Sequence, residues 1–323
     1  MSISSHALVV PTLADVRSAA ALIADHLPKT PLYPSPVLSR AVGAEIYVKH
    51  ENHLPTGAFK VRGGVNLCGR LSDDERATGV IAASTGNHGQ SVAFGASLFG
   101  ITAKICVPQG ANPLKVRAIE DLGAEVIVQG VDFEAAKANA ARLSAQHGYR
   151  YVNSGDEPLL VAGVATHTLE ILEAEPGIEV IIVPIGGGSG AAGACVVVQG
   201  LKPDVEVIGV QSEASPAAYL SWKQGALVTA PNKTFAEGLA TGAPFEFPQK
   251  IMREHLADFV LVSDEALADA QLRMIEATRN LVEAAGAAPL AAALALKDRL
   301  AGKKIALICS GGNATPDQLR ALL

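Results

Sequence analysis

The stretch "VIIVPIGGGSGAAGACVVVQGL", residues 180–201, decides the fold class. It begins as a continuous apolar run, passes through a glycine-rich segment at 186–190, and continues as an apolar helix. A buried strand that leads directly into a helix is the unit of a parallel α/β sheet. Free backbone N–H groups and the helix dipole favour an anion at such a helix start, and phosphate is the expected guest.

Two other interpretations of this loop stay open on the loop alone. No Gly-Lys-Ser/Thr follows, so it is not a Walker loop. Gly188, Gly190 and Gly193 have the dinucleotide-binding spacing, yet the next strand ends on Gln211 where a ribose-binding acid is expected, with Glu213 two residues further on. A tight strand-to-helix turn without a ligand is the plain alternative.

The rest of the chain repeats the alternation of strands and helices. We expect strands near 79–84, 102–108, 124–130, 149–154, 180–186, 205–212, 258–262 and 304–309, and helices near 87–100, 112–123, 132–148, 158–176, 189–201 and from Ser263 or Asp264 onward. The strands are near-continuous apolar runs, as expected of parallel strands covered on both faces. Without an obvious linker or repeat, the sequence predicts an α/β protein of two interleaved lobes.

Composition narrows the class of protein. The chain has 323 residues, of which 49% are hydrophobic, 18% charged and 4% aromatic, so it can bury a large core of small residues. The net charge of −6 without a basic block argues against a nucleic-acid partner. We find neither a signal peptide nor an 18-residue apolar run, and expect a cytoplasmic protein without a membrane segment. The four cysteines have no metal-type spacing and are expected as buried free thiols.

Two further loops follow predicted strands and carry polar side chains. "ASTGNHGQS" (83–91) offers Ser84, Thr85, Asn87 and His88, which suit a carboxylate or an aromatic oxygen. For His88 alone, a hydrogen-bonded histidine at a helix start is an equal alternative. "CSGGN" (309–313) places the hydroxyl of Ser310 after the last core strand, although a Gly-Gly turn alone explains this motif.

The stretch "PTGAFKVRGG" (55–64) contributes an amine, that of Lys60. On this stretch alone a solvated surface lysine is the simpler interpretation. A desolvated lysine has a lowered pKa and can form a Schiff base, and the nearby glycines with Phe59 would let a flat cofactor lie against the backbone. An amine, a phosphate cradle, a contact for an aromatic oxygen and a neutral hydroxyl together match one cofactor, pyridoxal 5'-phosphate.

At this point the sequence resembles a known family, the fold-type II (tryptophan synthase β-like) pyridoxal phosphate enzymes, in their serine/threonine dehydratase and serine racemase branch. The resemblance covers nearly the whole chain and rests on motifs that occur in the same order. They are "ENHLPTGAFKVRGG", "ASTGNHGQS", "LKVRAIEDLGAEV", "PIGGGSGAAG", "EGLA", "VEAAGAA" and "CSGGN". A nicotinamide dehydrogenase would leave all but the glycine loop unexplained.

The resemblance implies a role for each candidate residue. Lys60 would hold the cofactor aldehyde covalently and, once freed, take the substrate Cα proton, while Phe59 packs beside the ring. Asn87 would bond the ring hydroxyl and Ser310 would face the ring nitrogen. The phosphate would lie against Gly186, Gly187, Gly188, Ser189 and Gly190. The substrate carboxylate would bind to Ser84, Thr85, Asn87 and His88.

The resemblance also implies an architecture. Residues 1–74 and 154–323 would form the large cofactor-binding domain, and residues 75–153 a small mobile domain that closes over the substrate. A homodimer is expected. Because the chain stops at Leu323, soon after "CSGGN", we expect no C-terminal regulatory domain of the kind found in biosynthetic threonine deaminases.

Several positions depart from the family pattern. Ala58 replaces a frequent serine, and Thr85 stands where serine racemases carry the serine that protonates the opposite face, which argues mildly against racemisation. Gln211 and Ala217 occupy the places of the acidic pair that binds a divalent cation in racemase-like members, so no metal is expected there. The stretch "NSGDEPLLVAGVAT" (153–166) is altered close to the expected side-chain pocket.

The leading hypothesis is a pyridoxal phosphate-dependent dehydratase, or ammonia-lyase, that converts a β-hydroxy-α-amino acid to a 2-oxo acid and ammonia. L-Threonine or L-serine is the default substrate. Because the stretch 153–166 departs from the family pattern, a larger substrate such as phenylserine or 3-hydroxyaspartate is the other option. Serine or amino-acid racemisation on the same fold is the alternative. A binding protein without turnover is a third class, against which the intact Lys60 and carboxylate loop argue.

Overall fold

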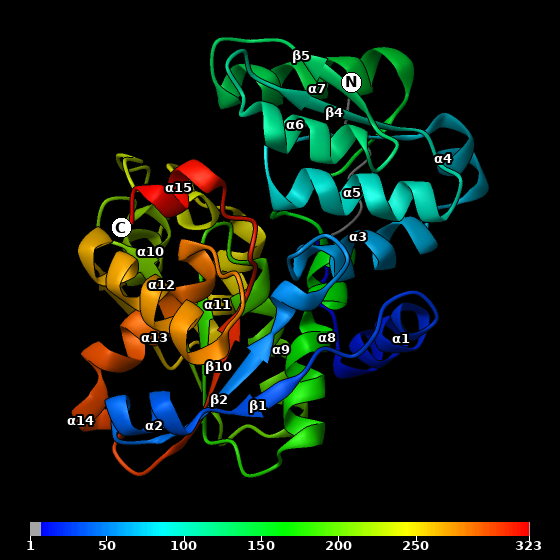
Figure 1. Cartoon of the computed structure of the whole chain (residues 1–323). Helices are drawn as coiled ribbons and strands as arrows, with labels where there is room; N and C mark the ends of the chain where they lie inside the picture. The colour runs from blue at the N-terminus through cyan, green and yellow to red at the C-terminus, as the bar shows by residue number, and fades with distance from the viewer. Residues whose placement is uncertain (1–7, 323) are drawn as a thin grey trace.

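Two β-sheets organise the molecule, and the computed structural model describes residues 8–322 (Figure 1). The larger sheet has six strands in the order β1-β2-β10-β7-β8-β9, and the smaller has four in the order β5-β4-β3-β6. All neighbours are parallel except β1 and β2. The strands are β1 (Leu32–Pro34), β2 (Glu45–His50), β3 (Val80–Ala83), β4 (Ala103–Val107), β5 (Glu125–Val128), β6 (Arg150–Tyr151), β7 (Val180–Pro184), β8 (Glu206–Ser212), β9 (Asp258–Val262) and β10 (Lys304–Cys309).

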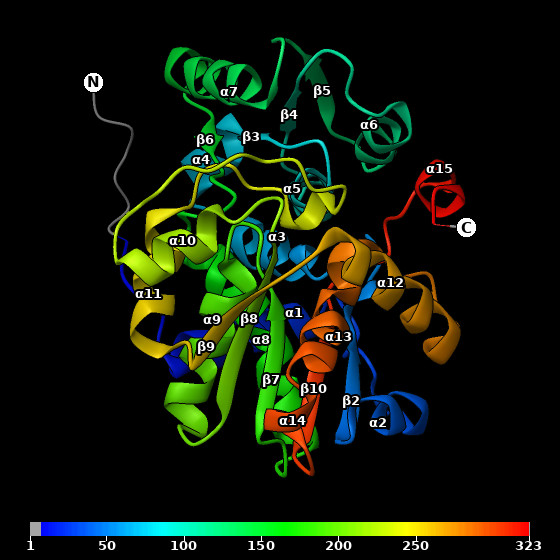
Figure 2. The same cartoon turned by 90° about the vertical axis from the view of Figure 1, so that its left-hand side faces the viewer.

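Helices cover both faces of each sheet (Figure 2). They are α1 (Leu13–Ala24), α2 (Pro36–Val42), α3 (Lys60–Gly69), α4 (Asp73–Thr78), α5 (Asn87–Leu98), α6 (Pro113–Glu120), α7 (Phe133–His147), α8 (Pro158–Ala174), α9 (Ser189–Leu201), α10 (Ala217–Gln224), α11 (Glu246–His255), α12 (Asp264–Thr278), α13 (Ala284–Ala295), α14 (Lys297–Leu300) and α15 (Pro316–Arg320), with short 3₁₀ turns η1 (Glu51–His53) and η2 (Glu237–Leu239). Several predicted helix starts carry side-chain caps, among them Asp132 for α7 and Ser263 for α12, whereas α5 and α9 have none.

The strands of the larger sheet bury side chains on both faces, as their apolar runs predict. In β10, Ile305 and Leu307 join the core under α2, α12 and α13, while Ala306 and Ile308 join the core under α8, α9 and α11. The smaller sheet repeats the pattern. Its strand β3 sends Val80 and Ala82 toward α5 and α6 and sends Ile81 and Ala83 toward α7. Each lobe is therefore a three-layer α/β unit.

The α/β prediction is confirmed, and the expected strands and helices occur within a few residues of their predicted ends. The strand predicted at 149–154 is shorter, since β6 is only Arg150–Tyr151. Its continuation turns away because the side-chain oxygen of Asn153 accepts from the N–H groups of Gly155 and Asp156, at 3.0 and 3.1 Å. The domain boundaries near residues 75 and 153, and the motion of the smaller domain, stay predictions.

Two other expectations concern the whole chain. All four cysteines are buried and free, as predicted from their spacing. Among the helices of residues 8–322, none has the length and apolar character needed to cross a membrane.

Candidate active site

Lys60 lies at the first position of helix α3, directly after Phe59. Its Nζ donates to Oγ of Ser189 at 2.7 Å and to the backbone oxygen of Ser154 at 3.3 Å. Burial lowers the pKa of the Lys60 amine to about 8. The lysine is therefore held by groups from α9 and from the altered 153–158 turn, and it is not a solvated surface residue.

The glycines after Lys60 do not act as the sequence suggested. A Cβ on Gly64 would lie 2.1 Å from the backbone oxygen of Ser91, and a Cβ on Gly63 would lie 3.1 Å from Leu160. Gly63 and Gly64 thus let α3 pack closely against α5 and α8, in place of approaching a cofactor. The expectation that these glycines contact a flat ring is wrong, since the helix that starts at Lys60 uses them for helix packing.

The glycine loop lies between β7 and α9, where the carboxyl end of the strand meets the helix start. Gly188 has φ +91, and a Cβ on Gly186 would lie 2.2 Å from the backbone oxygen of Gly238. Within the described chain, the backbone N–H groups of residues 186–191 donate to no protein acceptor. They form an anion cradle at an uncapped helix start, with the buried Ser189 at its edge.

Phe59 lies between this cradle and helix α8. Its ring carbon Cε2 would lie 3.2 Å from a Cβ on Gly190. Toward α8, the Phe59 ring forms an edge-to-face pair with the buried His167, at 5.9 Å between ring centroids. The Lys60 ammonium is 5.5 Å from the same ring. The aromatic side chain is thereby fixed beside the lysine and the glycine loop.

Asn87 is held by two residues that the sequence analysis did not single out. Its Nδ2 donates to Oε1 of Glu283 at 2.8 Å, and its Oδ1 accepts from Nδ2 of Asn313 at 2.7 Å. Burial raises the pKa of the Glu283 carboxyl. Glu283 lies in the motif "VEAAGAA", and Asn313 is the last residue of "CSGGN". The motifs therefore pointed to these two segments, but no spacing along the sequence predicts their contact with Asn87.

The loop at 84–88 ends β3 and begins α5. Ser84 is buried, and its Oγ accepts from the backbone N–H of Gly86 at 3.2 Å. The side chain of Thr85 is partly exposed beside it. His88 is buried with Nε2 3.3 Å from the oxygen of Val152, while its Nδ1 has no partner in residues 8–322. Burial and the nearby positive charge of Lys60 lower the pKa of His88 to about 3, so this imidazole is neutral at ordinary pH.

Ser310 follows β10 and is buried beside α3. Its backbone oxygen accepts from the N–H of Phe59 at 2.9 Å, and a bridge joins Ala58 to Gly311. These bonds tie the end of the last core strand to the residue before Lys60. The preceding Cys309 is fully buried, and burial raises the pKa of its thiol, so it is a packing residue.

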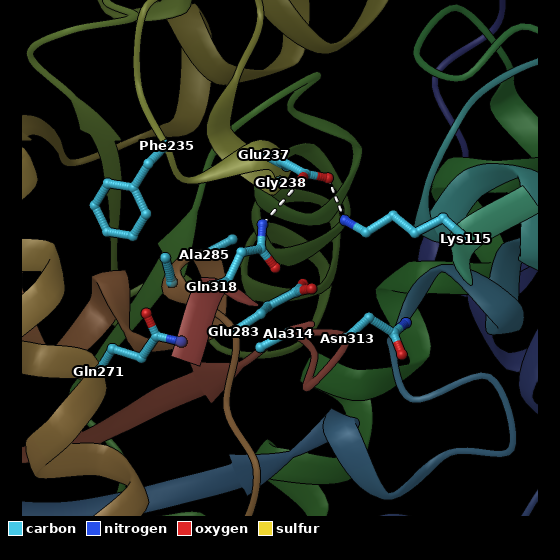
Figure 3. A pocket seen from close by; sticks show the side chains of 11 residues that line it. Lys115, Phe235, Glu237, Gly238, Gln271, Glu283, Ala285, Asn313, Ala314 and Gln318 are labelled. Atoms are coloured by element: carbon cyan, nitrogen blue, oxygen red, sulfur yellow. Dashed lines mark hydrogen bonds and ion pairs between the residues drawn. The ribbon is translucent and has the colours of Figure 1, made fainter. Parts of the chain in front are cut away.

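The two lobes also meet beside this site, around a small pocket (Figure 3). Lys115 of α6 forms an ion pair with Glu237 of η2, whose other oxygen accepts from Nε2 of Gln318 at 2.9 Å. Glu283 and Asn313 line the same pocket, which places the ion pair next to the residues that hold Asn87.

The structure thus brings several of the residues assigned to one site into contact, while the place of Ser84 and Thr85 in that site stays a prediction. Lys60 contacts Ser189 directly, Phe59 joins the glycine loop to α3, and Ser310 is bonded to Phe59. Asn87 reaches the end of "CSGGN" through Asn313. Three features fit a cofactor that has a phosphate and an aldehyde, together with a substrate that has a carboxylate. They are the unpaired N–H groups of the cradle, the lowered pKa of the Lys60 amine beside it, and the Nδ1 of His88, which has no partner in residues 8–322.

Gln211 and Ala217, at the positions of the family's cation site, have other roles in this structure. Oε1 of Gln211 accepts from the N–H of Tyr219 at 3.1 Å, and Ala217 is a buried residue at the start of α10. Residues 8–322 contain no group of three or more His, Cys, Asp or Glu side chains that could hold a metal ion.

Comparison with known proteins agrees with this geometry. The family described as "Pyridoxal-phosphate dependent enzyme" matches residues 23–311. L-threonine ammonia-lyase of Thermotoga maritima is 39% identical over 303 residues, which cover 94% of this chain and 75% of that protein. L-threo-3-hydroxyaspartate ammonia-lyase of Saccharomyces cerevisiae is 35% identical over 317 residues, covering 98% of this chain and 97% of that protein.

The solved structures include that of maize serine racemase. It superposes with a TM-score of 0.92 at 30% identity, covering 97% of both chains. The chain belongs to the pyridoxal-phosphate dependent enzyme family, as a fold-type II lyase of the dehydratase, or ammonia-lyase, kind.

Proposed function

We propose that this enzyme converts a β-hydroxy-α-amino acid to a 2-oxo acid and ammonia, with L-threonine or L-serine as the default substrate. The observation that carries the proposal is the amine of Lys60. Burial lowers its pKa to about 8, and it lies 2.7 Å from Ser189 at the edge of an anion cradle. The names of the two ammonia-lyases at 39% and 35% identity support the same reaction class.

We assign each part of pyridoxal 5'-phosphate to described residues, as the family resemblance implies. We assign its phosphate to Gly186, Gly187, Gly188, Ser189 and Gly190, its ring to the side of Phe59, its ring hydroxyl to Asn87 and its ring nitrogen to Ser310. When bound through its aldehyde, the cofactor supplies an electron sink for the pair left on Cα when the Cα proton is removed.

Proton transfer falls to Lys60. A buried amine with a pKa of about 8 is partly neutral near neutral pH, so it can accept the Cα proton without a second base. Loss of the Cβ hydroxyl as water, with a proton taken up by the hydroxyl, would leave an enamine; its tautomer, a 2-imino acid, is hydrolysed by water at C=N to the 2-oxo acid and ammonia. We assign the substrate carboxylate to Ser84, Thr85, Asn87 and the neutral His88, close to the unpaired Nδ1.

A serine at position 310 suits elimination better than transamination. A hydroxyl cannot keep the ring nitrogen protonated as a carboxylate would, so negative charge at Cα is stabilised less. Elimination lessens that demand, since the electron pair released at Cα would form the Cα–Cβ double bond while the β-hydroxyl departs with the Cβ–O pair. Ser310 is buried, and its backbone oxygen accepts from the N–H of Phe59, which fixes the backbone that carries the hydroxyl.

The test is release of 2-oxo acid by the purified holoenzyme from L-serine, D-serine, L-threonine, L-threo-3-hydroxyaspartate and L-threo-phenylserine. Best release from threonine or serine supports a general dehydratase. Best release from phenylserine or hydroxyaspartate means that the altered 153–166 stretch has changed the pocket. No release from any of them contradicts the proposal.

The matched variants are Lys60→Ala and Lys104→Ala. Lys104 is a lysine of strand β4 that pairs with Glu125. We expect Lys60→Ala to lose turnover by at least about a thousandfold and to lose the absorbance of the covalently bound cofactor. Lys104→Ala should keep both.

Amino-acid racemisation is the second candidate, and similarity to maize serine racemase supports it. Thr85 argues against it, because threonine stands where racemases carry the serine of the opposite face. Chiral analysis of enantiopure L-serine after incubation decides between the two, since a racemase accumulates D-serine and a dehydratase does not.

We also propose a cytoplasmic homodimer whose smaller domain, residues 75–153, closes on the larger one. This proposal rests on family resemblance. Sedimentation of the purified protein measures the assembly state, and a monomer at all concentrations would contradict it.

A further inference from the structure

The ring of Phe245 lies between the two loops that hold Lys60. A Cβ on Gly155 would lie 2.1 Å from Cγ of Phe245, and a Cβ on Gly187 would lie 3.1 Å from its Cε2. Gly155 follows Ser154, whose oxygen accepts from the Lys60 amine, and Gly187 belongs to the phosphate cradle. Phe245 therefore packs against residues that adjoin the groups around the Lys60 amine. Its ring fills the space that a side chain at position 155 would need.

The position of this ring is fixed by its surroundings. Phe245 directly precedes α11, and Oδ1 of Asp156 accepts from the N–H of Phe247 at 2.9 Å, so the 153–158 turn caps that helix from outside. The side chain of Asn153 in turn holds the N–H groups of Gly155 and Asp156. The turn and the start of α11 thus form one unit that packs an aromatic ring against Gly155 and Gly187, in the two loops that contact Lys60.

The charges around this ring are mainly negative. Asp156 and Glu246 flank it on the larger lobe. The ammonium of Lys137 on α7 lies 6.0 Å from the ring centroid, but it also pairs with Glu134 at 3.7 Å. The bound cofactor would take up Lys60 and the anion cradle, so one shared ammonium among three carboxylates would remain to meet a substrate carboxylate, which gives it no net attraction, and an aromatic wall gives it no hydrogen-bond donor.

We propose that Phe245 and Gly155 form the wall of the substrate side-chain pocket and select a β-hydroxy amino acid with an uncharged β-substituent over one with a carboxylate. This inference rests on the proposed function and narrows it, since L-threonine is then preferred to L-threo-3-hydroxyaspartate. Phe245 acts on the choice of substrate and takes no part in proton transfer.

The test is the ratio of kcat/KM for L-threonine to kcat/KM for L-threo-3-hydroxyaspartate. We expect a ratio of about ten or more in the unchanged enzyme. Phe245→Arg, which supplies a cation at the wall, should lower that ratio at least about tenfold, and the neutral donor variant Phe245→Gln should lower it about threefold. The control is Phe99→Leu, a half-buried phenylalanine at the far end of α5, which should leave the ratio unchanged.

A ratio separates selection from folding, because a loss of active enzyme lowers both terms equally. The inference is overturned if the unchanged enzyme uses hydroxyaspartate as well as threonine, or if both Phe245 variants keep the ratio within about twofold.

A second arm measures the pocket without turnover. Spectral titration of the holoenzyme with L-2-aminobutyrate and L-aspartate, which lack the β-hydroxyl, should show tighter binding of the aminobutyrate, reversed in Phe245→Arg. If the enzyme shows this binding preference but no turnover, the dehydratase proposal is wrong and the pocket inference stands. If the enzyme turns substrate over but binds the two analogues equally, the pocket inference is wrong and the dehydratase proposal stands.

Discussion

Burial lowers the pKa of the Lys60 amine to about 8, whereas a solvated lysine has an ordinary value of 10.5. Covalent binding of an aldehyde requires the neutral amine. Below the pKa the neutral fraction falls about tenfold for each pH unit, and above it the fraction levels off. The protonation state of one side chain therefore sets how fast the apoenzyme takes up its cofactor.

We expect the rate of recombination of the apoenzyme with pyridoxal phosphate to rise with pH and to level off above a pH of about 8. The change in cofactor absorbance after mixing measures this rate. Free Nα-acetyl-lysine is the matched control, whose rate should keep rising toward a pH of about 10. An enzyme rate that follows the control would show that the amine is not desolvated in solution.

The pair Gly155 and Phe245 gives a second test at the residue scale. A Cβ at 155 would lie 2.1 Å from Cγ and 2.6 Å from Cβ of Phe245, atoms at the base of that side chain, so Gly155→Ala should cost about 1–3 kcal/mol of stability and lower activity. Urea denaturation and kcat/KM measure the two losses. Gly242→Ala, whose Cβ would meet Ala230 at an ordinary 3.4 Å, should cost little.

Adding Phe245→Ala to Gly155→Ala should restore at least about 1 kcal/mol, because the clash is removed with the ring. Additive losses in the double variant would mean that the two residues do not contact one another.

At the scale of the elements, helix α3 is anchored by a buried ionic network around Arg62. This side chain is fully buried and donates to Glu51 at 2.6 and 2.9 Å and to Glu170 at 2.7 and 2.9 Å. The bonds join α3 to η1 and α8. Because Lys60 is the first residue of α3, the network also fixes the backbone position from which the Lys60 side chain extends into the site.

We expect Arg62→Met to lower the free energy of unfolding by about 3–5 kcal/mol, since it leaves the carboxylate of Glu51 buried without its main partner. The arginine lowers the pKa of Glu51 to about 2, so its loss should raise that pKa and make the variant gain stability, relative to the native chain, as the pH falls. Urea unfolding at two pH values measures both effects. Arg117→Met, at an exposed pair with Asp121, is the control and should cost less than about 0.5 kcal/mol.

The sequence predicts elements well where local chemistry decides them. The apolar run 180–184, the glycine loop and the capping residues Asp132 and Ser263 are local signals, and each has the expected structure. The contact of Asn87 with Glu283 joins residues 196 positions apart, and no local pattern encodes it. The same holds for Gly63 and Gly64, because a glycine needed for helix packing and one needed beside a ligand are alike in sequence.

At the scale of the molecule, the candidate site depends on how the two lobes meet. The glycine loop, Lys60 and Ser310 adjoin α9, α3 and β10 of the larger lobe, while Ser84, Asn87 and His88 lie between the end of β3 and the first turn of α5, beside the smaller sheet. Figure 1 shows these elements. Lys115 and Glu237 form an ion pair across this boundary, and Gln318 of α15 supports the glutamate (Figure 3). The pair favours the arrangement in which both halves of the site face each other.

Lys115→Met should therefore weaken the domain closure that we propose and leave the chemistry intact. An ion pair that is partly exposed contributes about 1 kcal/mol, so we expect KM for the substrate to rise about three- to fivefold with little change in kcat. The matched control is Lys104→Met, which breaks a pair of similar exposure within the smaller sheet: the side-chain exposures are 11% and 49% for Lys115 and Glu237, and 17% and 59% for Lys104 and Glu125. Both variants lose one surface ion pair and should change the melting temperature alike, but only Lys115→Met should raise KM. Equal KM values in the two variants would mean that the pair across the boundary does not govern access to the site, and that closure depends on the substrate and cofactor contacts alone.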